Sequence, residues 1–309
     1  MLTRENMDGL YVLVVTPFDD RFHLDTEGYR YNIRKLVRMG VDGIITTGTN
    51  GEFFVVNDEE LRTISRITVE ECQGSGTKVV VGASAVNTEE SIRRSRIAME
   101  EGAEGVMNVV PFYQTLTKAE AYQYFQDLAE ACPGLGIIIY NNPGTTKLLL
   151  NDSDFVELQK IPTVAGVKMI GADMSLYFNC LRRTEIPHFP LEQLWSVSHV
   201  VGGNGVMASF VYAFPAFMQR WWKAIRGGDV DQAMAFQHQC NEILQEAIIP
   251  LAGEGYNDTS LTKATVNAAG YFKAGPPRPP SEAAPAERIE RLRATFEERF
   301  SHFLEDEIR

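Results

Sequence analysis

The chain has 309 residues, of which 44% are hydrophobic and 23% are charged, as in an ordinary globular protein and not a disordered one. Its 29 basic and 41 acidic residues give a net charge of −12, so it lacks the basic surface with which proteins bind nucleic acids. No apolar run approaches the roughly 20 residues of a membrane span, and the N-terminus does not resemble a signal peptide. We therefore expect a cytoplasmic protein.

The cysteines and histidines do not form a recognisable site. Cys72, Cys132, Cys180 and Cys240 are scattered along the chain, which predicts buried free thiols and not a disulfide framework. The five histidines do not have the spacing of metal ligands. We predict no metal site built by the protein.

Short apolar, β-branched runs recur along the chain, and each predicts a strand that is buried on both faces, as in a parallel sheet. They span residues 11–16, 43–47, 79–82, 105–110, 137–140, 164–169 and 205–212. Between them, Asn57, Asn87 and Thr117 each precede a glutamate by three residues, which is the spacing of a helix capping box. Gly40 and Gly102 are placed to end helices in the left-handed conformation.

This alternation predicts an α/β protein, a (β/α)8 TIM barrel. Two strand–helix units fit between Gly40 and Gly102 at about 31 residues each, and eight such units need about 250 residues. A doubly wound open sheet is the alternative. It is disfavoured because the usual G-x-G-x-x-G after the first strand is missing, and residues 16–19 read TPFD instead. We assign the barrel to residues 1–225.

Residues 226–309 contain helical patterns only and predict a C-terminal helical extension. Asp229 is placed to start a helix after two glycines. Apolar residues spaced three and four apart near the end of the chain form one amphipathic stripe: Ile289, Leu292, Phe296, Phe300 and Phe303. We expect this stripe to pack on the barrel, as ordinary core, or on a neighbouring subunit.

Lys168 is the first candidate for chemistry, because it ends an otherwise apolar strand and active sites of TIM barrels lie at the carboxyl ends of the strands. Such a lysine is more often a surface residue whose stem covers apolar atoms. On a buried strand, however, desolvation favours the neutral amine, which can attack a ketone to form a Schiff base. Tyr140 and Tyr113 end neighbouring strands and could move protons there, or simply pack as aromatic residues.

The second strand is followed by Gly48, Thr49, Asn50 and Gly51. Glycines allow close approach of the backbone, and several free N–H groups can hold a carboxylate. Taken alone, the segment is equally compatible with an ordinary glycine-rich turn.

Together these segments resemble the dihydrodipicolinate synthase/N-acetylneuraminate lyase family of Schiff-base aldolases. The resemblance lies in residues 43–52 (GIITTGTNGE), 140–143 (YNNP) followed by Lys168, and 273–280 (KAGPPRPP). It implies a class I lyase that makes or breaks a C–C bond between an aldehyde and pyruvate or a related 2-oxo acid. It also implies a homotetramer and no metal or organic cofactor.

The resemblance further implies a role for each site residue. Lys168 would form the imine, and Tyr140 would be the acid/base. Thr49 would hydrogen-bond Tyr140, and Tyr113 would complete a proton relay, reaching in from a neighbouring subunit. The substrate carboxylate would be held by Gly48, Thr49 and Asn50.

The reaction stays open at this point. Synthases of the family have an arginine shortly after Y-N-x-P, where this chain has Thr145. Residues 85–89 and 263–275 resemble trans-o-hydroxybenzylidenepyruvate hydratase-aldolases, which would make Asn142 and Asn257 substrate-binding residues. Residues 187–199 are expected to line the pocket for the second substrate. The alternatives are a dehydratase of sugar-derived 2-oxo acids, a 4-hydroxy-tetrahydrodipicolinate synthase, and a non-catalytic 2-oxo acid sensor.

Overall fold

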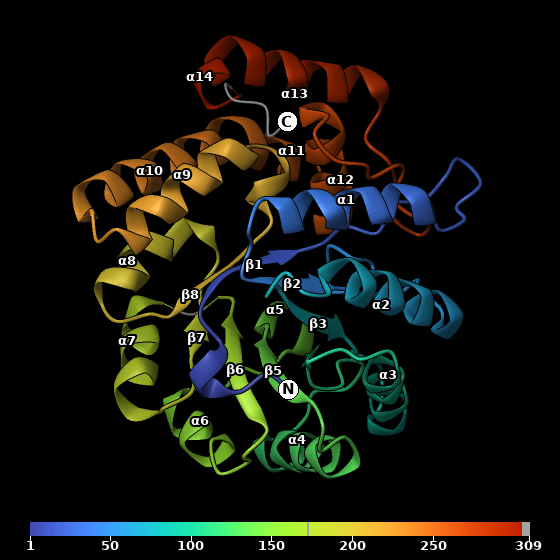
Figure 1. The fold of residues 1–309 in the computed structure, drawn as a ribbon, viewed down its shortest axis with the longest axis vertical. Helices are drawn as coiled ribbons and strands as arrows, with labels where there is room; N and C mark the ends of the chain where they lie inside the picture. The colour runs from blue at the N-terminus through green and yellow to red at the C-terminus, as the bar shows by residue number, and fades with distance from the viewer. Residues whose placement is uncertain (172, 305–309) are drawn as a thin grey trace.

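The computed structural model describes residues 1–171 and 173–304. Eight parallel strands follow one another around a ring in the order β7-β6-β5-β4-β3-β2-β1-β8, and the backbone N–H of Met207 donates to Pro190 O (3.2 Å) where β8 meets the chain after β7. The predicted TIM barrel is confirmed (Figure 1). The strands are β1 (Gly9–Leu13), β2 (Gly43–Thr46), β3 (Lys78–Gly82), β4 (Gly105–Asn108), β5 (Gly136–Asn141), β6 (Val164–Met169), β7 (His188–Phe189) and β8 (Gly205–Ala208).

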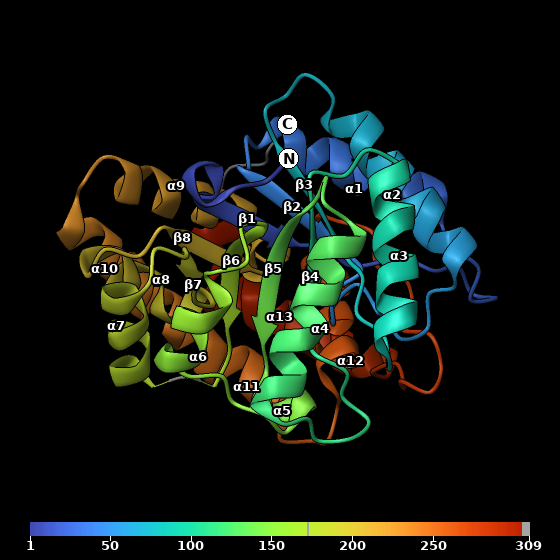
Figure 2. The same ribbon diagram turned by 90° about the horizontal axis from the view of Figure 1, so that it is seen from below.

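Helices cover the outside of the ring of strands (Figures 1 and 2). They are α1 (Thr26–Arg38), α2 (Asp58–Cys72), α3 (Thr88–Glu100), α4 (Lys118–Ala131), α6 (Asp152–Leu158), α7 (Met174–Arg183) and α8 (Trp195–Val200), with a short α5 (Pro143–Thr146) after β5. Short helical turns are η1 (Arg4–Asn6), η2 (Glu192–Leu194) and η3 (Phe210–Tyr212).

The predicted helix boundaries are set by local chemistry. Asn57 and Thr117 form reciprocal capping boxes with the glutamates three residues later, and Asn87 accepts a hydrogen bond from the backbone of Glu90. Gly40 and Gly102 have φ of 71° and 90°, the left-handed conformation that glycine adopts without steric cost. The predicted starts and stops are therefore confirmed.

The buried apolar residues divide into two layers. One lies between the strands and the helices, and the other fills the inside of the barrel, because successive side chains of a strand point to opposite faces. The inner layer consists of Leu2, Met7, Tyr11, Leu13, Ile45, Val80, Met107, Val109, Ile138, Tyr140, Ala165, Phe189 and Met207.

An irregularity in β6 decides which face Lys168 occupies. The register of β6 against β5 shifts by one residue just after Val164, so that Ala165 is an extra residue. In a regular strand Lys168 would share the face of Val164, which packs in the outer layer. The extra residue reverses this alternation and turns Lys168 to the interior, beside its register partner Tyr140. Such bulges commonly re-aim a side chain next to an active site.

Three predicted strands differ from the observed ones by two residues or more, and one observed strand was not predicted. Strand β1 begins and ends earlier than residues 11–16, β4 ends at Asn108 and not at residue 110, and β8 ends at Ala208, since the chain then turns into η3. Strand β7 has only two residues and lies between Pro187 and Pro190. A strand this short leaves no periodic pattern in the sequence.

His188 in β7 gives the fold a predictable acid sensitivity. Its ring is completely buried, Nδ1 lies 2.6 Å from Ile186 O, and Nε2 has no hydrogen-bond partner within the described residues. Burial lowers the pKa of His188 from 6.5 to about 4. Between these values the unfolded chain binds the proton more tightly, so the free energy of unfolding falls as the pH decreases through this window. We expect a loss of about 2–3 kcal/mol from this residue between pH 7.5 and 4.5.

Urea unfolding of the native protein and of His188→Asn at the two pH values checks this expectation. The variant should lose less stability on acidification than the native protein, whereas His199→Asn, at an exposed position, should behave like the native protein. Equal acid sensitivity of the native protein and His188→Asn would contradict the expectation.

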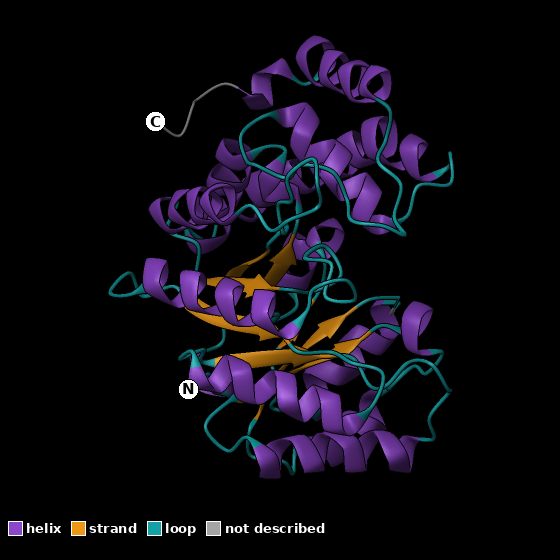
Figure 3. Ribbon diagram, turned by 90° about the vertical axis from the view of Figure 1, so that its right-hand side faces the viewer, coloured by secondary structure: helices purple, strands orange, loops and turns teal. Residues whose placement is uncertain are grey.

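The C-terminal helices lie together at one end of the molecule, beside the barrel (Figure 3). They are α9 (Pro215–Arg226), α10 (Val230–Ile243), the π-helical η4 (Leu244–Ile248), α11 (Ile249–Ala252), α12 (Asp258–Ala269), α13 (Ala286–Arg299) and α14 (Ser301–Leu304). Asp229 caps α10 as predicted.

The predicted apolar stripe packs on this same chain. The ring of Phe296 lies 5.0 Å from that of Phe214, and the ring of Phe303 lies 4.9 Å from that of Phe217, both partners being next to or within α9. The four cysteines are buried and free, as predicted. Among the described residues, no helix combines the length and the apolar character that crossing a membrane would require.

Candidate active site

Lys168 and Tyr140 meet at the carboxyl end of two adjacent strands. Both side chains are buried, with exposed fractions of 3% and 6%. The Nζ atom of Lys168 lies over the Tyr140 ring, 4.1 Å from its centroid, and Phe189 of β7 is the register partner of Lys168 on the other side. The amine is therefore buried and lies directly beside the phenol of Tyr140.

The glycine-rich segment after β2 forms a tight turn over the same end of the barrel. Glu52 N donates to Thr49 O (3.0 Å), and the Thr16 hydroxyl donates to Gly51 O (2.7 Å). A Cβ on Gly51 would lie 2.6 Å from the backbone nitrogen of Thr47, so only glycine fits there without movement of the backbone.

This turn leaves donors without partners. The backbone N–H groups of Thr49 and Asn50 have no hydrogen-bond acceptor within residues 1–171 and 173–304. Gly48 lies next to the barrel interior, because a Cβ there would come within 3.2 Å of Met107 Cε. Free N–H groups close to the axis of the barrel form the kind of concavity that binds anions.

A buried ionic cluster joins this turn to the C-terminal segment. Glu52 and Lys263 of α12 are 0% and 1% exposed, and Lys263 Nζ lies 2.6 Å from Glu52 Oε1. The second carboxylate oxygen accepts the backbone N–H of Arg278 (2.9 Å). Lys263 also donates to Pro276 O (2.8 Å), and its amine lies over the ring of Phe18. We call this the Glu52–Lys263–Arg278 cluster.

Burial acts on both members of this ion pair. Desolvation lowers the pKa of Lys263 to about 8, and the nearby charge of Glu52 opposes the shift. Desolvation likewise raises the pKa of Glu52, against the effect of Lys263. Each charge thus depends on its partner, as expected for ions taken out of water.

Removing one partner should therefore be costly. We expect Lys263→Met to lower the free energy of unfolding by about 3–5 kcal/mol, because Glu52 is then left buried without its counter-ion. The double variant Glu52→Gln/Lys263→Met should recover a large part of this loss. Chemical unfolding of the native protein, Lys263→Met, Glu52→Gln and the double variant forms a double-mutant cycle that measures the coupling.

An exposed ion pair supplies the control. Lys160 Nζ lies 2.6 Å from Glu157 Oε2, with side chains 67% and 50% exposed, and Lys160→Met should cost less than about 1 kcal/mol. If Lys263→Met lowered the free energy of unfolding as little as Lys160→Met does, the buried ion pair would not be essential for stability.

The remaining predicted residues lie around the rim. Tyr113 is 78% exposed, and the described part of this single chain contains no hydrogen bond among the hydroxyl groups of Tyr113, Tyr140 and Thr49. Asn142 caps α5 through its backbone carbonyl. Asn257 caps α12: its Oδ1 accepts the backbone N–H of Ser260 (2.9 Å), and its Nδ2 donates to Ser281 Oγ (3.0 Å).

A cavity of about 250 Å³ lies between the chain after β7, the chain after β8 and the C-terminal helices. Leu191, Glu192 and Gln193 contribute to its wall and belong to the segment expected to line the second-substrate pocket. Asp258, the first residue of α12, lines the cavity as well. Desolvation raises the pKa of Asp258, and the charge of Lys168 opposes this shift.

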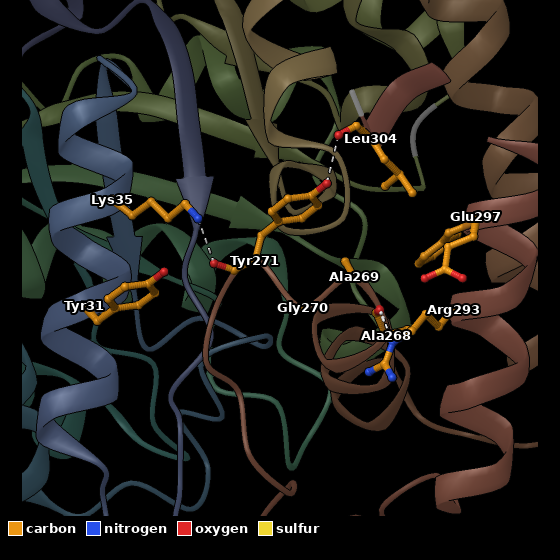
Figure 4. Close-up of a pocket in the computed structure, with 10 residues that line it drawn as sticks. Tyr31, Lys35, Ala268, Ala269, Gly270, Tyr271, Arg293, Glu297 and Leu304 are labelled. Atoms are coloured by element: carbon orange, nitrogen blue, oxygen red, sulfur yellow. Dashed lines mark hydrogen bonds between the residues drawn. The ribbon is translucent and has the colours of Figure 1, made fainter. Parts of the chain in front are cut away.

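A larger hollow of about 500 Å³ lies elsewhere, between α1, the end of α12 and α13 (Figure 4). Its polar groups are engaged locally: Lys35 donates to Tyr271 O (3.1 Å), and Arg293 donates to Ala268 O (3.1 Å). It contains none of the predicted site residues. In the described ranges, no three His, Cys, Asp or Glu side chains are arranged to hold a metal ion.

Three residues near the site were not predicted to act there. Glu52 and Arg278 stand inside recognisable motifs, but their spacing of more than two hundred residues gives no sign that they meet. Asp258 follows a helix-capping asparagine, as an ordinary first-turn acid would. No pattern in the sequence connects it to Lys168.

Comparison with known proteins agrees with this architecture. A model of the dihydrodipicolinate synthetase family matches residues 6–298. The 4-hydroxy-tetrahydrodipicolinate synthase of Methanopyrus kandleri is 29% identical over 296 residues, which cover 93% of this chain and 94% of that relative. The protein of the same name from Thiobacillus denitrificans is 32% identical over 248 residues, 79% of this chain and 80% of the relative.

Among solved structures, that of PhdJ bound to a substrate intermediate matches with a TM-score of 0.86 and 26% identity, covering 94% of this chain and 95% of that one. The family match extends over nearly the whole barrel and the C-terminal helices. The chain therefore belongs to the dihydrodipicolinate synthetase family and is an enzyme of the class I, Schiff-base aldolase and lyase type.

Proposed function

We propose that the protein is a pyruvate-dependent aldolase that joins pyruvate to an aldehyde, or cleaves the corresponding product, through an imine on Lys168. The observation that carries this proposal is the buried amine of Lys168 above the ring of Tyr140 on the next strand. Together these two side chains supply the nucleophile and the acid/base group that imine formation requires.

The proposed reaction needs no reactant other than pyruvate, the aldehyde, water and the Lys168 amine. The Lys168 amine attacks the C2 carbonyl of pyruvate and water leaves, which gives the imine. Loss of a proton from C3 forms an enamine, with the imine nitrogen accepting the electron pair. C3 then attacks the aldehyde carbon, whose oxygen takes up a proton, and hydrolysis of the imine releases a 4-hydroxy-2-oxo acid and frees the lysine.

We assign the proton transfers to Tyr140 and the binding of the pyruvate carboxylate to the turn after β2. Tyr140 is the phenol next to the amine, and phenols serve as acid/base groups when suitably placed. The free N–H groups of Thr49 and Asn50, together with Gly48, suit a carboxylate near the barrel axis.

We propose that Tyr113 acts at the active site of a neighbouring subunit. Its side chain is 78% exposed, although it follows β4 at the same end of the barrel as the site. A neighbouring subunit packed at this place would remove the aromatic ring from water. We propose a homotetramer in which Tyr113 of one subunit takes part in proton transfer at the site of its neighbour.

Two resemblances bear on the second substrate. Residues 85–89 and 263–275 resemble hydratase-aldolases, which favours a reaction in which the new hydroxyl group leaves as water after C–C bond formation. The relatives named 4-hydroxy-tetrahydrodipicolinate synthase make that reaction the second candidate. Thr145, where synthases have an arginine, supports the first candidate over the second.

Reductive trapping tests the proposal. Incubation with pyruvate and borohydride, followed by peptide mass spectrometry, should place one adduct on Lys168. Lys263 is the internal control, since it is equally buried but engaged with Glu52. An adduct on Lys263, or none at all, would overturn the assignment.

A further inference from the structure

The turn after β2, which is proposed to hold the pyruvate carboxylate, is fixed by a side chain that lies outside it. We propose, resting on the function above, that Arg94 of α3 is a positioning residue for the 2-oxo acid: it fixes Phe53 and, through it, the free N–H groups of the turn. The proposal is supported by strained backbone at both ends of the turn, by the hydrogen bonds of Arg94 and by the burial of its charge without a counter-ion.

The turn after β2 is strained at both of its ends. Thr47 and Glu52, which flank residues 48–51, have φ of 43° and 57°, the left-handed conformation that residues other than glycine rarely adopt. Such a conformation persists only where the surrounding structure enforces it. The turn therefore depends on contacts with other segments, and its N–H groups would change direction if those contacts were lost.

Hydrogen bonds hold each end of the turn. The Thr47 hydroxyl donates to Gly82 O (2.9 Å) at the end of β3. At the other end, Phe53 follows the strained Glu52 and donates its backbone N–H to Gly48 O (3.2 Å). Phe53 is thus bonded to the first glycine of the turn, so a group that fixes Phe53 also fixes the turn.

Arg94 fixes Phe53 from the adjacent helix. Its terminal nitrogens, Nη1 and Nη2, both donate to Phe53 O, each at 3.1 Å. The same nitrogens donate to Ser84 O (3.2 Å) after β3 and to Val56 O (2.6 Å) before α2. The guanidinium group therefore joins the chain after β2 to the chain after β3. The planar fork of an arginine suits three carbonyls at once, whereas a lysine has a single amine.

The charge of Arg94 is buried at a cost to stability. Arg94 is 8% exposed, and it forms no ion pair within the described part of the chain. Burial lowers the pKa of Arg94, and the charge of Arg93 acts in the same direction. Its Nε atom has no hydrogen-bond acceptor in residues 1–171 and 173–304. A buried cation without a counter-ion is unfavourable, and such departures from the most stable arrangement are expected at functional sites.

The contacts of Arg94 predict which kinetic constant depends on it. The turn would bind the carboxylate both before and after the imine forms, so a displaced turn weakens binding of the substrate and of the transition state alike. Arg94→Met keeps the apolar stem and removes the donors. It should raise the KM for pyruvate at least about tenfold and change kcat less than about threefold.

The preceding residue of the same helix supplies the control. Arg93 is exposed and paired with Asp58, so Arg93→Met should leave the KM for pyruvate and kcat as in the native protein. Arg94→Lys, which keeps the charge and one donor group, should raise the KM for pyruvate less than Arg94→Met does.

Borohydride trapping with two ketones distinguishes this role from a merely structural one. Acetone shares the ketone and a methyl group with pyruvate but has no carboxylate, so its adduct with Lys168 does not depend on the turn. At concentrations below saturation, Arg94→Met should lower the ratio of the trapping rates of pyruvate and acetone at least about tenfold. Arg93→Met should leave this ratio unchanged. Equal slowing of both ketones by Arg94→Met would mean that the amine itself is disturbed, and would overturn the inference.

A second variant keeps the test decisive if thermal unfolding shows that Arg94→Met is not folded. Arg94→Lys should then lower the ratio for pyruvate and acetone at least about threefold, and an unchanged ratio would contradict the role of Arg94.

Trapping of the native protein with pyruvate separates this inference from the proposed function. An adduct on Lys168, combined with a ratio that the Arg94 variants do not change, contradicts only the role of Arg94. Absence of the adduct contradicts the imine mechanism and, with it, this inference.

Discussion

Lys168→Met is expected to lower kcat by at least about 10⁴-fold while the protein stays folded. The amine is the only group to which the substrate would be covalently bound, and loss of a covalent intermediate restores most of the barrier. Stability should be kept or increased, because methionine fills similar space and no buried carboxylate is hydrogen-bonded to Lys168 in the described structure. Steady-state assays with pyruvate and an aldehyde, with thermal unfolding in parallel, check both parts.

The exposed position 160 supplies a matched control, and Lys160→Met should retain full activity. Turnover by Lys168→Met within tenfold of the native rate would show that another group forms the intermediate. An unfolded variant would instead contradict the expected effect on stability, and Lys168→Arg, which keeps the stem and removes nucleophilicity, would then provide the kinetic comparison.

Tyr140→Phe is expected to lower kcat by about 10²–10⁴-fold, the usual contribution of a positioned acid/base. The ring that lies under the Lys168 amine remains, so pyruvate binding and the packing of the barrel should change little. The borohydride adduct should still form, but more slowly. Single-turnover kinetics of adduct formation, together with kcat, distinguish a lost proton transfer from lost binding.

Tyr31→Phe serves as the control, since Tyr31 is exposed on α1 and removal of its hydroxyl should have no kinetic effect. The comparison of Tyr140→Phe with the native protein also tests the alternative that the protein is a non-catalytic 2-oxo acid sensor. A sensor would bind pyruvate equally well with and without the Tyr140 hydroxyl and would turn over no aldehyde in either form.

The sequence was informative wherever a local rule applies. Residues 164–169 were predicted as a strand with the observed bounds, because a short and mostly apolar run is typical of a buried strand. The capping residues Asn57 and Thr117 were predicted because their hydrogen bonds span only three residues. Strand β7 was missed since two residues between prolines have no period.

For the site as well, the sequence predicted what depends on local rules and missed what depends on packing. Lys168 and Tyr140 could be named from the sequence because each ends a predicted strand, and the carboxyl ends of barrel strands meet by geometry alone. That the amine lies over the phenol ring depends on the extra residue in β6, which the sequence does not reveal. A one-residue shift reverses the face of every later side chain.

The amino-acid sequence by itself determined the barrel, the helical extension and the two candidate catalytic side chains, since periodicity, capping and strand order are local properties. Only the tertiary structure decided that Glu52 and Lys263 form a buried ion pair and that Glu192 and Asp258 line one cavity. These contacts join segments far apart in the chain. The energies of these contacts depend on how far the charged groups are removed from water, which is decided only when the chain is packed.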